Sequence, residues 1–187
     1  SKSICGILDP EGLTSVDKDR ISLEQAMADY GCRPGQLASC KMEDVGTYLE
    51  LHIEQGPIMD VENVKIGAVE NLQGIHWQRV TIEGAANHAG TTPTALRADA
   101  GLAAAKVNVF LRQLVEKSGG VATMGTIRLE PNAINVIPSR AVFTVDLRNS
   151  DKAKLEADEK ALAGYFNELE QSDHVKISTE RLTEFDP

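Results

Sequence analysis

The densest group of side chains able to carry chemistry is Glu50-Leu51-His52-Ile53-Glu54-Gln55-Gly56-Pro57. In an extended strand, Glu50, His52 and Glu54 project to one face, because successive side chains alternate. A histidine between two carboxylates on that face suits a metal ligand oriented by acids, or a proton-transfer pair. The solvated face of an edge strand explains the same pattern. A single His-x-Glu is weak evidence, since metal sites need three or four ligands.

A second candidate is the loop Asn87-His88-Ala89-Gly90-Thr91-Thr92, which lies between a predicted strand and a predicted helix. The start of a helix offers free backbone N–H groups and a potential that favours negative charge. There, His88 could donate a hydrogen bond to an anion or to a developing oxyanion. Helix capping by the threonine hydroxyls, with His88 as a bystander, explains the loop equally well.

The third candidate combines the run from Asn132 to Pro138 with Asp146-Leu147-Arg148, two segments that bracket a predicted hairpin. Arg148, at a strand end, could bind a carboxylate through two parallel hydrogen bonds, and Asn135 could add an amide contact. Turn chemistry explains the asparagines without a ligand. A surface ion pair explains Arg148.

The elements that must position these residues follow a regular order after residue 72. The hydrophobic pattern predicts these elements: a strand over Ile75–Gly84; a helix with its N-cap at Thr92, Pro93 at its first position and its end at Gly119-Gly120; strands over Val121–Leu129 and Ala141–Leu147; a helix capped by Asn149, Ser150 or Asp151; and a strand over Val175–Leu182. The order β-α-β-β-α-β predicts a ferredoxin-like fold, with two helices on one face of a four-stranded antiparallel sheet. The open sheet edges favour pairing with a second copy. His76 and His174 fall in predicted strands without polar neighbours, and we expect both to be structural.

The first 72 residues predict fewer elements. Ser22-Leu23-Glu24-Gln25 matches a capping box, and Gly31 ends the short helix that begins there. Two strand-like runs follow, Thr47–Ile53 and Ile66–Val69. One helix and two short strands bury too little surface for independent stability. We therefore expect residues 1–72 to be part of a larger domain and residues 73–187 to form a domain of their own.

Composition narrows the classes of partner. The 187 residues carry 28 acidic and 19 basic side chains, a net charge of −9, which disfavours nucleic acid because phosphate binding needs clustered Lys and Arg. No apolar run approaches the roughly 20 residues that cross a bilayer, so no membrane partner is expected. Three cysteines without C-x-x-C spacing suit a reducing compartment, which indicates a cytoplasmic protein.

Together and in this order, the segments resemble the amidase and carbamoylase branch of the M20 metallopeptidase-like hydrolases. That branch includes N-carbamoyl-L-amino-acid hydrolases, allantoate amidohydrolases and β-ureidopropionases of the same type. The resemblance extends from Tyr48 to Arg148. It rests on these blocks: LELHIEQGP (49–57), Ile66-Gly67, NHAGTTP (87–93), Arg97 with Asp99-Ala100, PNAINVIP (131–138) and FTVDLR (143–148).

The resemblance implies an α/β protein in which a ferredoxin-like α+β lid, which also dimerises, is inserted into a metallo-aminopeptidase-like catalytic domain with two divalent metal ions. It makes His52 a metal ligand and Gln55 a substrate contact. It makes His88 the lid histidine that stabilises the tetrahedral intermediate, commonly in the partner subunit's active site. Asn135 and Arg148 would hold the substrate carboxylate.

Departures from the family pattern bear on activity. Thr94 stands where methionine is common and Ser139 where glycine is common, and neither position carries chemistry. The family site also needs an upstream HxD segment, a bridging Asp, a Glu-Glu pair and a downstream His, which this chain lacks. The resemblance therefore implies a fragment of a larger enzyme.

The expected activity is that of the parent enzyme. It is a hydrolase that cleaves the carbamoyl C–N bond of N-carbamoyl-L-amino acids, a small-molecule ureido substrate, with zinc, manganese, cobalt or nickel. The fragment is expected to be inactive alone. An allantoate amidohydrolase or an M20 peptidase or deacylase are alternatives within the class. A non-catalytic dimerisation module is the alternative outside it.

Overall fold

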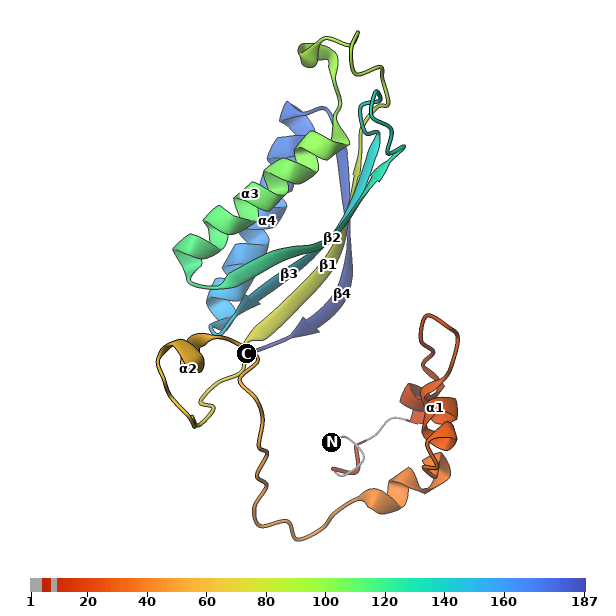
Figure 1. Cartoon of the computed structure of the whole chain (residues 1–187), viewed down its shortest axis with the longest axis vertical. Coiled ribbons are helices and arrows are strands. Elements are labelled where there is room, and N and C mark those ends of the chain that lie inside the picture. The colour runs from red at the N-terminus through yellow and green to blue at the C-terminus, as the bar shows by residue number, and fades with distance from the viewer. Residues whose placement is uncertain (1–4, 8–9) are drawn as a thin grey trace. The chain divides into compact units, whose positions relative to one another are not determined.

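The computed structural model describes residues 5–7 and 10–187. The chain divides into two units, residues 1–65 and residues 66–187, and each is described by itself (Figure 1). Among the described residues, no helix combines the length and apolarity that crossing a membrane requires.

The first unit contains short helices. They are η1 (Pro10–Thr14), α1 (Leu23–Asp29), η2 (Pro34–Cys40) and α2 (Ile58–Val61). Half of the capping box predicted at Ser22 is confirmed, since its hydroxyl oxygen accepts a hydrogen bond from the Gln25 N–H at 3.1 Å. The Gln25 side-chain amide donates to Asp29 at 2.7 Å rather than completing the box. Gly31 follows the helix with a φ of 79°, a left-handed conformation that glycine adopts without steric cost.

The two strands predicted over 47–53 and 66–69 are wrong, because both segments are irregular. Within the described part of the chain, no strand pairs with either of them. An unpaired strand leaves its backbone N–H and C=O groups without ladder partners, so an alternating pattern alone does not fix the extended state.

The second unit has the predicted ferredoxin-like fold. Its elements are β1 (Gly74–Glu83), η3 (Thr94–Leu96), α3 (Ala100–Ser118), β2 (Val121–Glu130), β3 (Arg140–Asn149), α4 (Lys152–Ser172) and β4 (Lys176–Phe185). The strand order is β2-β3-β1-β4 and every neighbouring pair is antiparallel. Figure 1 shows α3 and α4 side by side on one face of the sheet.

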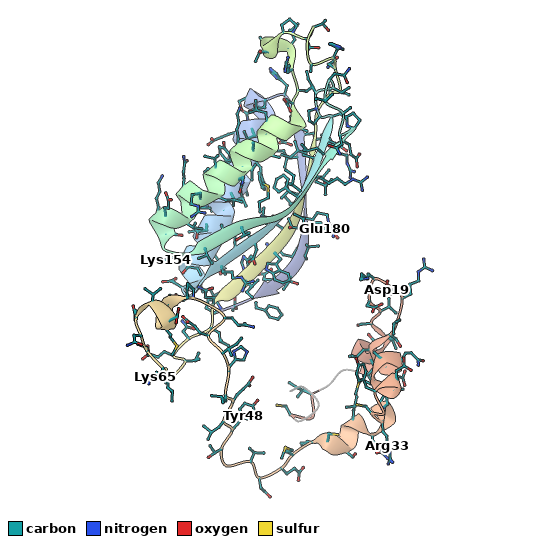
Figure 2. All side chains as sticks on the ribbon, in the orientation of Figure 1. Asp19, Arg33, Tyr48, Lys65, Lys154 and Glu180 are labelled. Atoms are coloured by element: carbon teal, nitrogen blue, oxygen red, sulfur yellow. The ribbon has the colours of Figure 1, made fainter. Side chains whose placement is uncertain are left out.

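The core lies between that face and the two helices, where side chains fill the space (Figure 2). Every second residue of the central strands is buried there, as the period-two pattern predicts. The buried core residues are Val80 and Ile82 of β1, Ala141, Phe143, Val145 and Leu147 of β3, Ala100, Ala103, Ala104, Val107 and Leu111 of α3, Leu155, Leu162, Phe166 and Leu169 of α4, and Val175 before β4.

The predicted start of the first helix of this unit is wrong. Pro93 has a ψ of 143°, and residues 94–96 make a single 3-10 turn in which Leu96 is exposed. The helix begins at Ala100, because the Asp99 carboxylate accepts hydrogen bonds from the next two free N–H groups, Gly101 at 2.9 Å and Leu102 at 3.0 Å. Residues 92–98 are therefore part of a long loop.

His76 is buried as expected, but the prediction that it lacks polar neighbours is wrong. Its Nδ1 lies 2.8 Å from Glu159 Oε2 and its Nε2 lies 3.6 Å from Glu184 Oε1. The Nδ1 contact does not have hydrogen-bond geometry, and it is an ion pair only when the ring is protonated. Arg181 also pairs with both glutamates, which ties α4 to β4. His174 precedes β4 in a left-handed conformation, not in a strand.

A glycine substitution tests the close contact at the base of the long loop. A Cβ built on Gly84 would overlap the carbonyl oxygen of Ala98, which accepts a hydrogen bond from the Ala85 N–H at 2.8 Å. We expect Gly84→Ala to lower the free energy of unfolding by about 1–3 kcal/mol, the usual cost of overpacking. Gly164→Ala, in the open on helix α4, should instead raise it by about 0.5–1 kcal/mol. Urea unfolding followed by circular dichroism checks both, and equal effects would contradict the contact.

Stability should also depend on pH through Asp173. Burial raises the pKa of this carboxyl, but hydrogen bonds from Lys106 and Ser172, with the positive charges of Lys106 and His174, lower it further than burial raises it. A lowered folded-state pKa means that the carboxylate stabilises the fold above its unfolded value of 3.8, and that this is lost as the pH falls through the folded value.

We therefore expect Asp173→Asn to cost about 1–2 kcal/mol at pH 7, and the difference from the unsubstituted chain to shrink as the pH falls below 3.8. Asp186→Asn is the matched control, because the Lys152–Asp186 pair is more than half exposed and should contribute little. Chemical unfolding at several pH values measures both. A loss that is independent of pH would rule out the ion pair as its cause.

Candidate functional site

Two loops meet at one end of the sheet of the second unit, beyond the end of β1 and before the start of β3 (Figure 1). The Ala89 N–H donates to the Asn135 carbonyl at 2.9 Å, and the Ile137 N–H donates to the Asn87 carbonyl at 2.8 Å. These bonds pair the loop that carries His88 with the loop that carries Asn135. The structure thus brings together two of the site residues predicted from the sequence, both with exposed side chains.

The His88 ring has a defined hydrogen bond. Its Nδ1 accepts from the Gly90 N–H at 3.1 Å. A ring nitrogen that accepts carries no proton, so the neutral ring holds its proton on Nε2, which is a donor toward solvent. The expected helix N-terminus at this loop is wrong, because α3 begins only at Ala100. The imidazole itself is therefore the donor that this loop presents.

Arg97 also holds the loop that carries His88. The sequence does not predict this role, although Arg97 lies in one of the blocks that resemble the family. Its Nη2 donates to the Ala89 carbonyl at 2.7 Å, and its Nε and Nη2 both donate to the Thr92 carbonyl at 3.0 Å. The guanidinium is half-buried. An arginine shortly before a helix start gives no local indication that its partners are backbone carbonyls five and eight residues upstream.

Arg148 lies at the other end of β3, on the sheet face away from the helices, directly opposite Ile75. Its Nε and Nη2 bind the two carboxylate oxygens of Asp146 at 2.9 and 2.8 Å, and its guanidinium carbon lies 5.9 Å from the Trp77 ring centre. The hydrogen bond to Asp146 raises the pKa of Arg148, partly offset by desolvation. The ion pair expected as an alternative is present, with a partner two residues away on the same strand.

Within one chain, Arg148 and Asn135 lie far apart. The strand from Arg140 to Arg148 separates them, and at about 3.3 Å per residue this is about 25 Å. Their joint contact with one substrate carboxylate stays a prediction, and within this fold it requires two chains.

The predicted common face of Glu50, His52 and Glu54 is wrong, because no strand forms there. Glu50 accepts a hydrogen bond from the Tyr48 hydroxyl at 2.7 Å, and this bond raises the pKa of Tyr48. The Glu54 carboxylate accepts from backbone N–H groups at the start of α2, at 3.1 and 3.2 Å. Both acids are thus bound locally rather than aimed at the histidine.

His52 is exposed, and its Nδ1 lies 2.5 Å from the Ile53 carbonyl oxygen. Since a carbonyl only accepts, Nδ1 carries the proton and Nε2 keeps its lone pair, the form that binds a metal ion. Gln55 follows with a left-handed φ of 56°. Among the described residues, this segment included, no group of three or more His, Cys, Asp or Glu residues is placed to hold a metal. His52 therefore fits a single ligand, and these residues do not complete a site.

One hollow of the second unit contains none of the predicted site residues. It is an open cleft of about 470 Å³ between α4 and β4, with Gln78, Phe166 and Ile177 among its lining. Of its charged residues, Glu159 and Arg181 pair with each other, and Glu170 accepts a hydrogen bond from the Ile177 N–H at 2.7 Å. The cleft therefore does not compete with the loops as the candidate site.

Comparison with known proteins places this geometry in a family. Residues 71–174 match the model of the M20 peptidase dimerisation domain. The chain is 37% identical over 190 residues to an N-carbamoyl-L-amino acid amidohydrolase of Geobacillus stearothermophilus, covering 100% of this chain and 46% of that protein. It is 34% identical over 161 residues to the allantoate amidohydrolase of Escherichia coli K12, covering 83% and 38%.

Among solved structures, a hydantoinase/carbamoylase family amidase from Burkholderia multivorans superposes with a TM-score of 0.86 at 30% identity, over 99% of this chain and 45% of that one. The chain thus spans less than half the length of these relatives. The resemblance to the M20 amidase and carbamoylase branch is confirmed, and the chain belongs to the M20 peptidase dimerisation domain family.

Proposed function

We propose that this chain is the lid, with an adjoining catalytic segment, of a longer metal-dependent amidohydrolase that cleaves the ureido C–N bond of N-carbamoyl-L-amino acids. The observation that carries the proposal is the His88 ring, exposed beside Asn135 and fixed with Nε2–H as a free donor. The relatives named as N-carbamoyl-L-amino acid amidohydrolases support the choice of substrate. By itself the chain is proposed to be inactive.

Each residue has a proposed role. Attack on the ureido carbonyl places negative charge on its oxygen, and the Nε2–H of His88 donates to that oxygen. Asn135 and Arg148 bind the α-carboxylate, and Gln55 contacts the substrate. His52 gives one ligand to a pair of divalent ions, with zinc, manganese, cobalt and nickel all compatible, which would supply the activated water. The products are ammonia, carbon dioxide and an amino acid.

The lid is also proposed to form a homodimer through the β2 edge. The outer strand β4 carries Lys176, Glu180, Arg181 and Glu184, and such charges oppose pairing with another strand. By contrast, β2 has no charged residue from Val121 to Ile127, and both of these side chains are about half exposed. Helix α3, which packs on β2, exposes Leu102 and Val109.

A dimer also resolves the separation of Arg148 from the two loops. Because one chain holds them at opposite ends of the sheet, we propose that Arg148 serves one site and that the loops of the partner subunit complete it. Each site would then take Arg148 from one protomer and His88 and Asn135 from the other.

Two alternatives have support of their own. An allantoate amidohydrolase is favoured by relatives of that name, and assays with allantoate and N-carbamoyl amino acids separate the two activities. A non-catalytic dimerisation module is favoured by the absence of a complete ligand set in the described residues. Sedimentation with metal analysis of the chain tests the module. A metal-free dimer supports it, and two metal ions per chain contradict it.

The proposed setting is a reducing, cytoplasmic one. All three cysteines, Cys5, Cys32 and Cys40, are free and exposed. Exposed thiols persist where the thiol–disulfide balance keeps them reduced.

Single substitutions in the full-length enzyme test the roles. We expect His88→Ala to lower kcat about 10²–10³-fold with metal content unchanged, the cost of one oxyanion donor. Arg148→Ala should lower kcat/KM by about one to three orders of magnitude, from the loss of a charged contact. His174→Asn is the control, since His174 is an exposed lid histidine whose left-handed conformation asparagine tolerates. Steady-state kinetics and metal analysis measure all three, and lost metal in His88→Ala would contradict its role.

Mixing two inactive variants tests whether sites are shared between chains. A dimer of one His88→Ala chain and one Arg148→Ala chain has one site with both residues intact and one with neither. Random mixing should therefore restore about a quarter of the unsubstituted activity. His88→Ala mixed with Asn135→Ala is the control, because both residues come from the same chain to the same site, and no activity should return. Recovery in neither mixture would show that each site uses one chain.

A further inference from the structure

We propose that Arg97 is the positioning residue that sets the tautomer and direction of the His88 ring. The geometry of the loop supports this independently, and the consequence for catalysis rests on the function proposed above.

The contacts of Arg97 enclose the turn that gives His88 its hydrogen bond. The guanidinium binds the Ala89 carbonyl at 2.7 Å and the Thr92 carbonyl at 3.0 Å, one on each side of Gly90-Thr91. Within this turn, the Gly90 N–H reaches His88 Nδ1 at 3.1 Å. The orientation of the Gly90 N–H depends on the two peptide groups that Arg97 binds. The Arg97 side chain therefore fixes the N–H that donates to Nδ1, and this bond favours the form of His88 with its proton on Nε2.

The backbone of Arg97 is itself anchored. Arg97 is extended, with a φ of −89° and a ψ of 135°, and lies two residues before the Asp99 N-cap of the 19-residue helix α3. Between them, the Ala98 carbonyl accepts the Ala85 N–H at 2.8 Å, which closes the base of the loop. Arg97 thus connects a rigid helix to the turn that carries the histidine.

The requirement is for an arginine in particular. A planar guanidinium donates from two nitrogens in a fixed fork, and here the fork spans two carbonyls of one turn. Among the described residues, none of the ion pairs includes Arg97, and its hydrogen bonds go to backbone carbonyls. A lysine could reach one of the two carbonyls with its ammonium group but could not hold both in a plane.

The first test observes the ring rather than the reaction. Long-range ¹H–¹⁵N spectra of the 187-residue chain, at about pH 8 where an unperturbed histidine is neutral, report which nitrogen of His88 carries the proton, with His88→Gln assigning the signal. We expect a single Nε2–H form in the unsubstituted chain, a mixture of both forms in Arg97→Ala, and partial recovery in Arg97→Lys. Arg112→Ala, an exposed arginine on α3, is the matched control and should change nothing.

The second test is kinetic and uses the full-length enzyme. We expect Arg97→Ala to lower kcat about 10–100-fold with KM nearly unchanged, and to cost little more when His88 is already alanine, since coupled residues are not additive. An unchanged tautomer in Arg97→Ala, or an equal loss in the His88→Ala background, would overturn the positioning role. Should Arg97→Ala fail to fold, Arg97→Lys carries both tests with the same criteria.

The two tests separate this proposal from the proposed function. Suppose that the His88 tautomer depends on Arg97 but the full-length protein has no amidohydrolase activity. This result would support the positioning role and contradict the proposed function. An active enzyme whose His88 tautomer and kcat do not change in Arg97→Ala would contradict the positioning role and leave the proposed function supported.

Discussion

The antiparallel ladder between β1 and β3 is the constraint on which the rest of the lid depends. It runs in register over both strands, from Gly74 opposite Asn149 to Glu83 opposite Arg140. Because the strands are central and opposed in direction, the loop that leaves β1 and the loop that enters β3 meet at the same end of the sheet. That meeting brings His88 to Asn135. The same ladder sends Arg148 to the far end, so the fold that joins two of the residues also separates the third.

The ferredoxin-like fold of the elements from Gly74 to Phe185 could be predicted because its signals are local and repeated. Alternating burial in β1 and β3 follows the period of a strand, and the end of α3 follows from Gly119. The start of α3 could not be predicted, because Thr92-Pro93 and Asp99 are both acceptable caps in sequence. Contacts across the loop decide between them: the Ala98 carbonyl binds Ala85, and Arg97 binds carbonyls upstream. The run 47–53 failed for a related reason, since alternation predicts a strand but supplies no partner.

The candidate site divides in a similar way. The residue types at His52, His88, Asn135 and Arg148 were identifiable from sequence blocks, but their hydrogen bonds depend on single turns. The tautomer of His88 follows from one backbone N–H, and the Asp146 carboxylate reaches Arg148 only because both project from the same face of β3. His76 shows the same limit: its two acidic neighbours come from positions about 80 and 110 residues further along the chain, where no local pattern relates them.

The unequal edges of the sheet have a consequence for stoichiometry. A sheet that can pair with another copy at both of its edges adds copies without limit, which leads to fibres. Here one edge is charged along β4 and joined to the layer behind it by the Glu159–Arg181 pair, while β2 is uncharged over most of its length. In the proposed dimer, the two β2 edges pair once, edge to edge about a two-fold axis, and the edges that remain are the two charged β4 strands. The proposed dimer would therefore end at two copies rather than continue as an aggregate.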